Sequence, residues 1–262
     1  MINIFQGSLG SGKSASMVVD MCEHLMLGGV VAANFTLVPH WAEYLSSLSW
    51  RVRFGFVDRA AHVASLRSRF RFVNSLDDVW QASSDLIPLA ERTVAKQREG
   101  RGRLYLDECQ EIFNCRQWAD NRAWIHFFSQ SRKLRWDIVL TAHSVTMIDK
   151  QIRPFLEFET RFRNMAQVKF LGLIPVAPKS RPMFLAITRY AGISAGAGEI
   201  HSRRLYPLSK GFADLYDSHL VFGDKAAAVG LAVPPERCEA RPAKPHTSPI
   251  PRKQWGICNA YY

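Results

Sequence analysis

The sequence has 262 residues, of which 47% are hydrophobic and 22% charged, a globular balance that excludes collagen-like, coiled-coil and wholly disordered proteins. It contains no run of about 18 apolar residues and no signal-peptide pattern at its start, so we expect neither a membrane-spanning helix nor a signal peptide. The net charge of +11 favours a polyanionic partner, nucleic acid or anionic lipid, but is equally compatible with a solvated basic surface. The five cysteines form no C-x-x-C pair, which indicates reduced thiols rather than disulfides or a zinc site.

The first predicted elements open a parallel α/β sheet. A short buried strand at Ile2–Phe5 runs directly into glycines. A helix is expected from about Ser14 until Gly28-Gly29 ends it, because apolar residues recur there at helical spacing, and a second strand follows at Val30–Ala33. Strand, loop, helix and strand in this order are typical of a parallel sheet. The stretch 41–99 is mixed and basic, and we assign no elements to it.

The remaining sequence predicts two more core strands, followed by short strand patterns that prolines interrupt. Leu104–Leu106 and Asp137–Ala142 read as strands, and a helix is predicted between them at Asp120–Leu134. Later prolines separate short strand patterns at Val168–Leu171 and Met183–Thr188. We therefore predict a main α/β domain at 1–163, a small β-containing appendage at 164–222, and a Pro-rich basic tail at 223–262 that is disordered.

A phosphate-binding loop is the strongest motif. The Walker A pattern, G-x-x-x-x-G-K-[ST], matches eight consecutive residues between the first strand and the first helix: Gly7, Ser8, Leu9, Gly10, Ser11, Gly12, Lys13 and Ser14. Glycines let backbone N–H groups surround a phosphate, and the helix that follows adds its positive N-terminal end. Lys13 would reach the β- and γ-phosphates, and the Ser14 hydroxyl would ligate Mg²⁺. The alternative is a Gly-rich turn followed by a surface lysine.

Two acids at the end of a later strand supply the second half of such a site. Asp107 and Glu108 follow the apolar strand Leu104–Leu106 directly. Asp107 would hold Mg²⁺ through water, and Glu108 would be the general base for the attacking water. Without the phosphate loop, the same pair would be read as a solvated acidic turn.

His143 follows the strand at Asp137–Ala142 and is the candidate to sense the γ-phosphate, with Thr141 as the alternative. His143 could instead be a solvent-exposed residue at a strand end with no functional role. No N-K-x-D guanine motif occurs, so ATP is favoured over GTP. These features predict a P-loop NTPase of the RecA-like, additional-strand class, a three-layer α/β sandwich with a parallel sheet, plus the small β-containing appendage.

The chain also resembles the zonula occludens toxin-like (Zot-like) family, the assembly ATPases of filamentous bacteriophages. The resemblance runs from the first strand to Asn34 and resumes at L-Y-L-D-E-C-Q-E-I-F-N-C-R (Leu104–Arg116). It continues through F-F-S-Q-S-R-K-L-R-W-D-I-V-L-T-A-H-S (Phe127–Ser144) and I-D-K-Q-I-R (Ile148–Arg153), which covers roughly the first 160 residues. The family usually has glutamine where His143 stands and a membrane-spanning helix after the ATPase domain, and this sequence departs from it in both respects.

The resemblance implies a motor that couples ATP hydrolysis to virion assembly and extrusion. It implies a ring of identical subunits, with phage assembly proteins and coat protein at the host inner membrane as partners. Single-stranded DNA is a further candidate partner. We expect this chain in the host cytoplasm or at the cytoplasmic face of that membrane, attached peripherally. Multi-subunit motors often complete a site with an arginine from the next subunit, and Arg132 and Arg153 are the candidates; either could instead be a surface or phosphate contact.

Two other functions stay open. In a DNA-packaging or DNA-translocating ATPase, the segment Arg51–Phe72, with six arginines and one aspartate, would line the DNA path. Its aromatic residues would then stack on bases, although such spacing is also typical of core residues; these are Phe54, Phe56, Phe70 and Phe72. In a non-enzymatic, toxin-like interaction protein, the phosphate loop would serve stability alone.

Overall fold

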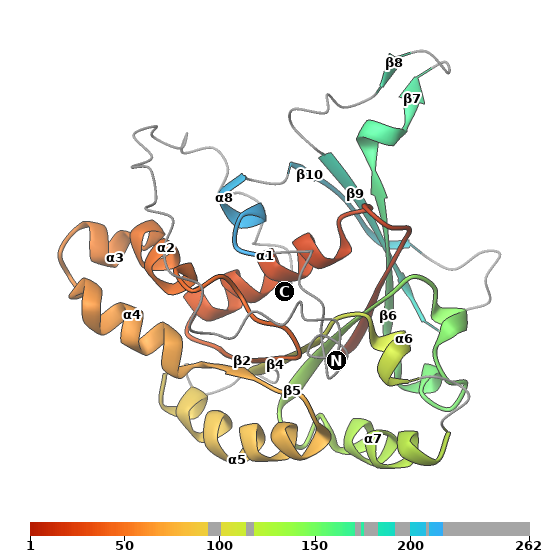
Figure 1. The fold of residues 1–262 in the computed structure, drawn as a ribbon, viewed down its shortest axis with the longest axis horizontal. Coiled ribbons are helices and arrows are strands. Elements are labelled where there is room, and N and C mark those ends of the chain that lie inside the picture. The colour runs from red at the N-terminus through yellow and green to blue at the C-terminus, as the bar shows by residue number, and fades with distance from the viewer. Residues whose placement is uncertain are drawn as a thin grey trace, which may run out of the picture.

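The fold of this computed structural model is built around one large sheet (Figure 1). The structure describes residues 1–93, 101–113, 118–170, 174–175, 183–191, 200–207 and 210–216. Among these residues, eight strands form the sheet in the order β10-β9-β6-β1-β5-β4-β2-β3. The bounds of these strands are β1 Ile2–Gln6, β2 Val30–Ala33, β3 Phe70–Phe72, β4 Gly102–Leu106, β5 Trp136–Ala142, β6 Phe158–Asn164, β9 Met183–Tyr190 and β10 Ile200–Pro207.

The core of the sheet is parallel, as predicted. β1 pairs in parallel with β5 and β6, β4 pairs in parallel with β5 and β2, and β2 pairs in parallel with β3. β5 therefore lies between β1, which leads into the phosphate loop, and β4, which ends in the two acids. This strand order is that of the additional-strand class of P-loop NTPases and confirms the predicted fold class.

Helices cover both faces of the sheet, which gives the predicted three layers. The helices are α1 Lys13–Met26, α2 Trp41–Leu48, α3 Trp50–Arg53, α4 Arg59–Ser68, α5 Leu76–Thr93, α6 Cys109–Ile112, α7 Trp118–Gln130 and α8 Lys210–Ala213. Short 3₁₀ turns are found at Val145–Met147, Arg153–Phe155 and Met165–Gln167. Figure 1 shows α5 and α7 together on one side of the sheet and α1 with α2 on the other.

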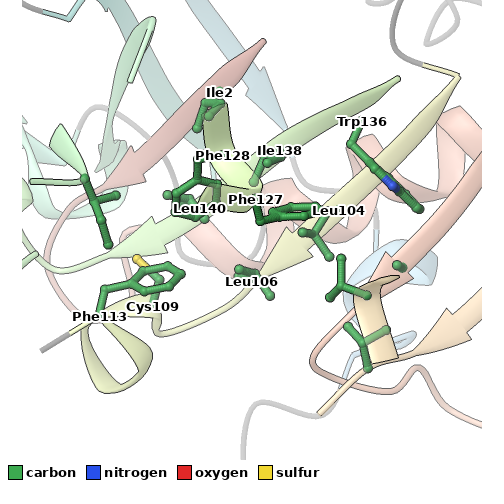
Figure 2. Packing of buried hydrophobic residues seen from close by; sticks show 14 of the residues in the cluster. Ile2, Leu104, Leu106, Cys109, Phe113, Phe127, Phe128, Trp136, Ile138 and Leu140 are labelled. Atoms are coloured by element: carbon green, nitrogen blue, oxygen red, sulfur yellow. The ribbon is translucent and has the colours of Figure 1, made fainter. Parts of the chain in front are cut away.

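Alternation along each strand divides the core into two apolar layers. In β1, Ile2 and Ile4 face the layer formed by α5 and α7, whereas Phe5 faces α1. Figure 2 shows the rings of Phe127 and Phe128 of α7 packed among the strand residues of the first layer. Because both faces are covered by helices, these strands are apolar almost throughout rather than alternating with exposed polar residues.

The segment 164–222, predicted as a small β-containing appendage, contributes β9 and β10 to the main sheet. β9 pairs antiparallel with β6, and β10 pairs antiparallel with β9, so both strands extend the main sheet. β6 would otherwise be an edge strand with unpaired N–H and C=O groups, and β9 supplies their partners. A small hairpin outside the sheet is formed by β7 (Lys169–Phe170) and β8 (Ile174–Pro175). The predicted tail, 223–262, lies outside the described residues.

Individual boundaries depend on local backbone geometry. The helix predicted at 120–134 is α7, which ends at Gln130, because residues 131–135 form a turn in which Arg135 adopts a φ of 61°. The stretch 41–99, to which the sequence analysis assigned no elements, contains α2, α3, α4, β3 and α5. Of the helices that the structure describes, none is both long enough and apolar enough to cross a bilayer.

The aromatic layer beneath the sheet yields a stability prediction. Phe127 is completely buried and contacts the rings of Trp80, Trp124 and Phe128. Phe127→Ala removes most of this packing and should lower the free energy of unfolding by about 3–5 kcal/mol in urea denaturation. Phe54→Ala is the control, because Phe54 is 70% exposed, and it should cost no more than about 0.5 kcal/mol. Equal losses in both variants would contradict this assignment of the core.

Candidate nucleotide site at the carboxyl ends of β1, β4 and β5

The predicted site residues of the phosphate loop and of the strand ends meet at one edge of the sheet. β1, β4 and β5 are parallel neighbours, so the residues that follow them come together: the phosphate loop after Gln6, the acids after Leu106 and His143 after Ala142. The two candidate arginines, Arg132 and Arg153, have other positions and partners. Arg132 lies in the turn before β5, at the opposite edge, and the Arg153 guanidinium donates to the carbonyls of Thr146 and Ile148 of its own chain.

The phosphate loop is shaped by close backbone contacts. Gly12 has a φ of 95°, and a Cβ there would overlap the ring of Phe184 in β9. A Cβ on Gly7 would come within 2.8 Å of the Phe162 carbonyl oxygen in β6. Both positions therefore require glycine. The strands that extend the sheet beyond β1 thus help to form the loop.

Lys13 is a buried cation at the base of this loop. It is 5% exposed, and its Nζ donates to the carbonyl oxygens of Gly7 at 2.8 Å and Ser8 at 3.3 Å. Burial lowers the pKa of Lys13, while the carboxylates of Glu108 and Asp107 oppose this shift. A buried ammonium group surrounded by backbone dipoles can bind an anion such as a phosphate oxygen.

Asp107 is the most densely hydrogen-bonded group of the site. Its side chain is 4% exposed, and Oδ1 accepts from the hydroxyls of Ser14, at 3.3 Å, and Thr141. Oδ2 accepts from the hydroxyl of Tyr216 at 2.9 Å. A hydroxyl and a carboxylate side by side are oxygen donors of the kind that Mg²⁺ prefers, so Ser14 and Asp107 fit the predicted metal site.

Glu108, the residue directly before α6, has a strained backbone conformation. Its φ and ψ are 49° and 44°, which is uncommon for a residue other than glycine and costs on the order of 1–3 kcal/mol. Its N–H donates to Thr141 Oγ1 at 2.9 Å, which holds the strained turn. One carboxylate oxygen accepts from Gln110 and lies 3.7 Å from His143 Nε2. A carboxylate held at this edge can accept a proton from water, and the imidazole of His143 lies beside it.

Two residues of this site had no role in the sequence analysis. Asn34 follows β2, and its side-chain amide makes two hydrogen bonds with the backbone of Asp107. It donates to the Asp107 carbonyl at 2.9 Å and accepts from the Asp107 N–H at 2.7 Å. A polar residue directly after a buried parallel strand is a signal that could have identified it. Tyr216 is 109 residues away from Asp107 in the chain, and no local pattern points to it.

The predicted aromatic patch is only partly exposed. Phe54 and Phe56 are each 70% exposed and Phe72 is 46% exposed, whereas the Phe70 ring packs against Trp41 with centroids 5.5 Å apart. Exposed aromatic rings next to arginines are able to stack on bases.

The two hydrogen bonds from Asn34 to the Asp107 backbone are predicted to stabilise the fold. Asn34→Ala would leave the N–H and carbonyl of Asp107 without these partners, so the free energy of unfolding should fall by about 1–3 kcal/mol in urea denaturation. Asn74→Ala is the matched control, because its side chain is exposed, and it should leave that free energy unchanged. If Asn34→Ala has the same free energy of unfolding as the control, these two hydrogen bonds do not stabilise the site.

Comparisons with known proteins confirm the resemblance to the Zot-like family. A family model described as Zonular occludens toxin (Zot) matches residues 63–177. The gene 1 protein of Enterobacteria phage I2-2 is 27% identical over 157 residues, which are 59% of this chain and 38% of that protein. The gene 1 protein of Enterobacteria phage M13 is 29% identical over 152 residues, which are 57% of this chain and 38% of that protein. This chain thus spans less than half the length of these relatives.

Solved structures resemble the fold at low sequence identity. The N-terminal domain of zonular occludens toxin from Neisseria meningitidis has a TM-score of 0.42 and 14% identity, over 82% of this chain and 98% of that chain. The genome packaging NTPase B204 from Sulfolobus turreted icosahedral virus 2 has a TM-score of 0.43 and 11% identity, over 77% and 96%. The fold class stands on the strand order and phosphate loop described above. The chain is therefore similar to Zonular occludens toxin (Zot) proteins over residues 63–177 and to the gene 1 proteins of filamentous phages over 152–157 residues.

Proposed function

We propose that this protein is an ATPase that supports the assembly and export of filamentous phage. The observation that carries the proposal is the convergence of Lys13, Ser14, Asp107 and Glu108 at the carboxyl edge of adjacent parallel strands. Each is of the chemical type that hydrolysis of a nucleoside triphosphate requires, which supports the proposal. The relationship to gene 1 proteins supports the role in phage assembly.

The proposed reaction uses these residues in distinct roles. Phosphate oxygens would replace the loop carbonyls as partners of the Lys13 ammonium, and Mg²⁺ bound by Ser14 and Asp107 would neutralise part of the phosphate charge. Glu108 would accept a proton from water as the water oxygen bonds to the γ-phosphorus and the bond to the leaving oxygen breaks, giving ADP and phosphate. His143, beside Glu108, would respond to the loss of the γ-phosphate.

The partners of the motor follow from the resemblance and are part of the proposal. They are further copies of this chain in a ring, phage assembly and coat proteins at the cytoplasmic face of the host inner membrane, and single-stranded DNA. A neighbouring subunit would have to bring Arg132 or Arg153 to this site, since within one chain Arg132 lies at the opposite edge and Arg153 holds its own backbone.

Conservative substitutions of the two acids test the proposed chemistry. Glu108→Gln keeps the shape but loses the base, so ATP binding should persist while hydrolysis slows by about 10²–10⁴-fold. Asp107→Asn should instead lose the Mg²⁺-dependent part of nucleotide binding. Binding is measured by titration with a fluorescent ATP analogue, hydrolysis by phosphate release, and Lys13→Ala is the reference variant that should bind poorly.

Three outcomes would contradict this proposal in different ways. Normal turnover by Glu108→Gln with inactive Asp107→Asn would mean that the roles of the two acids are reversed. Nucleotide binding by Lys13→Ala as tight as that of the unmodified chain would exclude the phosphate-loop assignment. ATP binding without any hydrolysis by the unmodified chain would favour the non-enzymatic interaction protein.

A DNA-translocating ATPase is the second candidate, because Phe54 and Phe56 are exposed beside Arg51 and Arg53. Single-stranded DNA should then stimulate ATP hydrolysis, and the stimulation should fall steeply as salt rises. The double substitution Phe54→Ala and Phe56→Ala should remove the stimulation and leave the basal rate unchanged. Leu27→Ala, which truncates an exposed apolar residue outside this segment, is the control. Stimulation that survives the double substitution would count against stacking on these rings.

A further inference from the structure

A tyrosine from the C-terminal part of the described chain contacts the proposed metal site. The hydroxyl of Tyr216 donates to Oδ2 of Asp107 at 2.9 Å, and Ser14 also lies close enough to its hydroxyl to affect its pKa. A phenol is protonated at neutral pH and therefore acts as the donor in this hydrogen bond. Tyr216 therefore contacts Asp107, one of the two side chains that would hold Mg²⁺, directly.

The position of Tyr216 is determined by packing and backbone contacts. Leu215 is 1% exposed in the apolar layer of α1, and its carbonyl accepts from the Val38 N–H at 3.0 Å. The ring of Tyr216 packs edge-on against Phe35, with centroids 5.4 Å apart. Figure 1 shows α8, which immediately precedes this segment, lying against α1. The packing of this segment against α1 and Phe35 thus fixes the position of the hydroxyl.

The hydroxyl completes the set of donors around the Asp107 carboxylate. Oδ1 accepts from Ser14 and Thr141, and also from the Glu108 N–H at 3.1 Å. Oδ2 accepts from Tyr216. A carboxylate with bonds on both oxygens cannot rotate freely. Oδ1 already accepts three hydrogen bonds, whereas Oδ2 accepts one and keeps a lone pair for water bound to a metal. Outer hydrogen bonds of this kind orient metal-binding groups and tune their affinity.

We propose that Tyr216 is a positioning residue for the metal site, which holds the Asp107 carboxylate in the orientation that binds Mg²⁺ with nucleotide. This inference rests on the proposed function. It also assigns a role to the segment 210–216: docking of this segment on α1 and Phe35 makes the metal site complete, so that the C-terminal part of the chain and the nucleotide site are energetically coupled.

The test measures metal binding directly in the full chain. Mn²⁺ serves as a paramagnetic probe in place of Mg²⁺, and its affinity in the presence of ADP is read from the electron paramagnetic resonance signal of free Mn²⁺. Tyr216→Phe keeps the ring and removes the hydroxyl, and it should weaken Mn²⁺ binding on the order of tenfold. ADP binding in EDTA should not change, because the phosphate loop is untouched.

Tyr105→Phe is the matched control. Tyr105 is also buried, and its hydroxyl also donates to a carboxylate, Asp20 Oδ2 at 2.7 Å, but the bond lies away from the metal site. This variant should bind Mn²⁺ as the unmodified chain does. In an Asp107→Asn background, Tyr216→Phe should have no further effect, since it acts through the carboxylate.

The outcomes separate this inference from the proposed function. Unchanged or tighter Mn²⁺ binding by Tyr216→Phe, or an equal loss in Tyr105→Phe, would overturn the positioning role while leaving the ATPase proposal intact. An additive effect in the Asp107→Asn background would also overturn it. If the unmodified chain binds ADP neither with nor without Mn²⁺, the proposed function fails, and the inference fails with it.

Discussion

The buried carboxylate of Asp107 is the constraint on which the site depends. A charged group that is 4% exposed is tolerated only if hydrogen bonds replace the water that it loses. Those bonds come from α1, from β5 and from the segment after α8, through Ser14, Thr141 and Tyr216. Asn34, after β2, holds the backbone of the same residue. The hydrogen bonds to this one carboxylate therefore hold elements that are distant in the chain next to one another.

The same edge concentrates opposite charges in a small space. Lys13 is buried close to Asp107 and Glu108, and its ammonium group is bonded to loop carbonyls rather than to a carboxylate. The cation is thus kept available to a phosphate, because a direct ion pair would have to be broken before an anion could bind. Glu108 is held in a left-handed conformation beside His143, and such local strain is typical of functional sites.

The strands beyond β6 belong to this arrangement as well. Phe184 of β9 covers Gly12, and Asn164, at the end of β6, donates to the Gly10 carbonyl at 3.3 Å. A segment that looks accessory in the sequence therefore supports the phosphate loop from the side opposite β5. Loop conformation and the extension of the sheet depend on each other, since Gly12 can approach the Phe184 ring only because it has no side chain.

The sequence pattern alone predicts the phosphate loop, the acids at 107–108 and the strands that carry them, because these depend on local spacing and on runs of buried residues. It also indicated the parallel three-layer fold, since a strand, a glycine-rich loop and a helix have few ways to pack. The pairing of β9 and β10 with the main sheet and the contact of Tyr216 with Asp107 could be learned from the folded structure alone. Edge pairing and contacts between residues 109 positions apart depend on how the whole chain packs, and no local pattern encodes them.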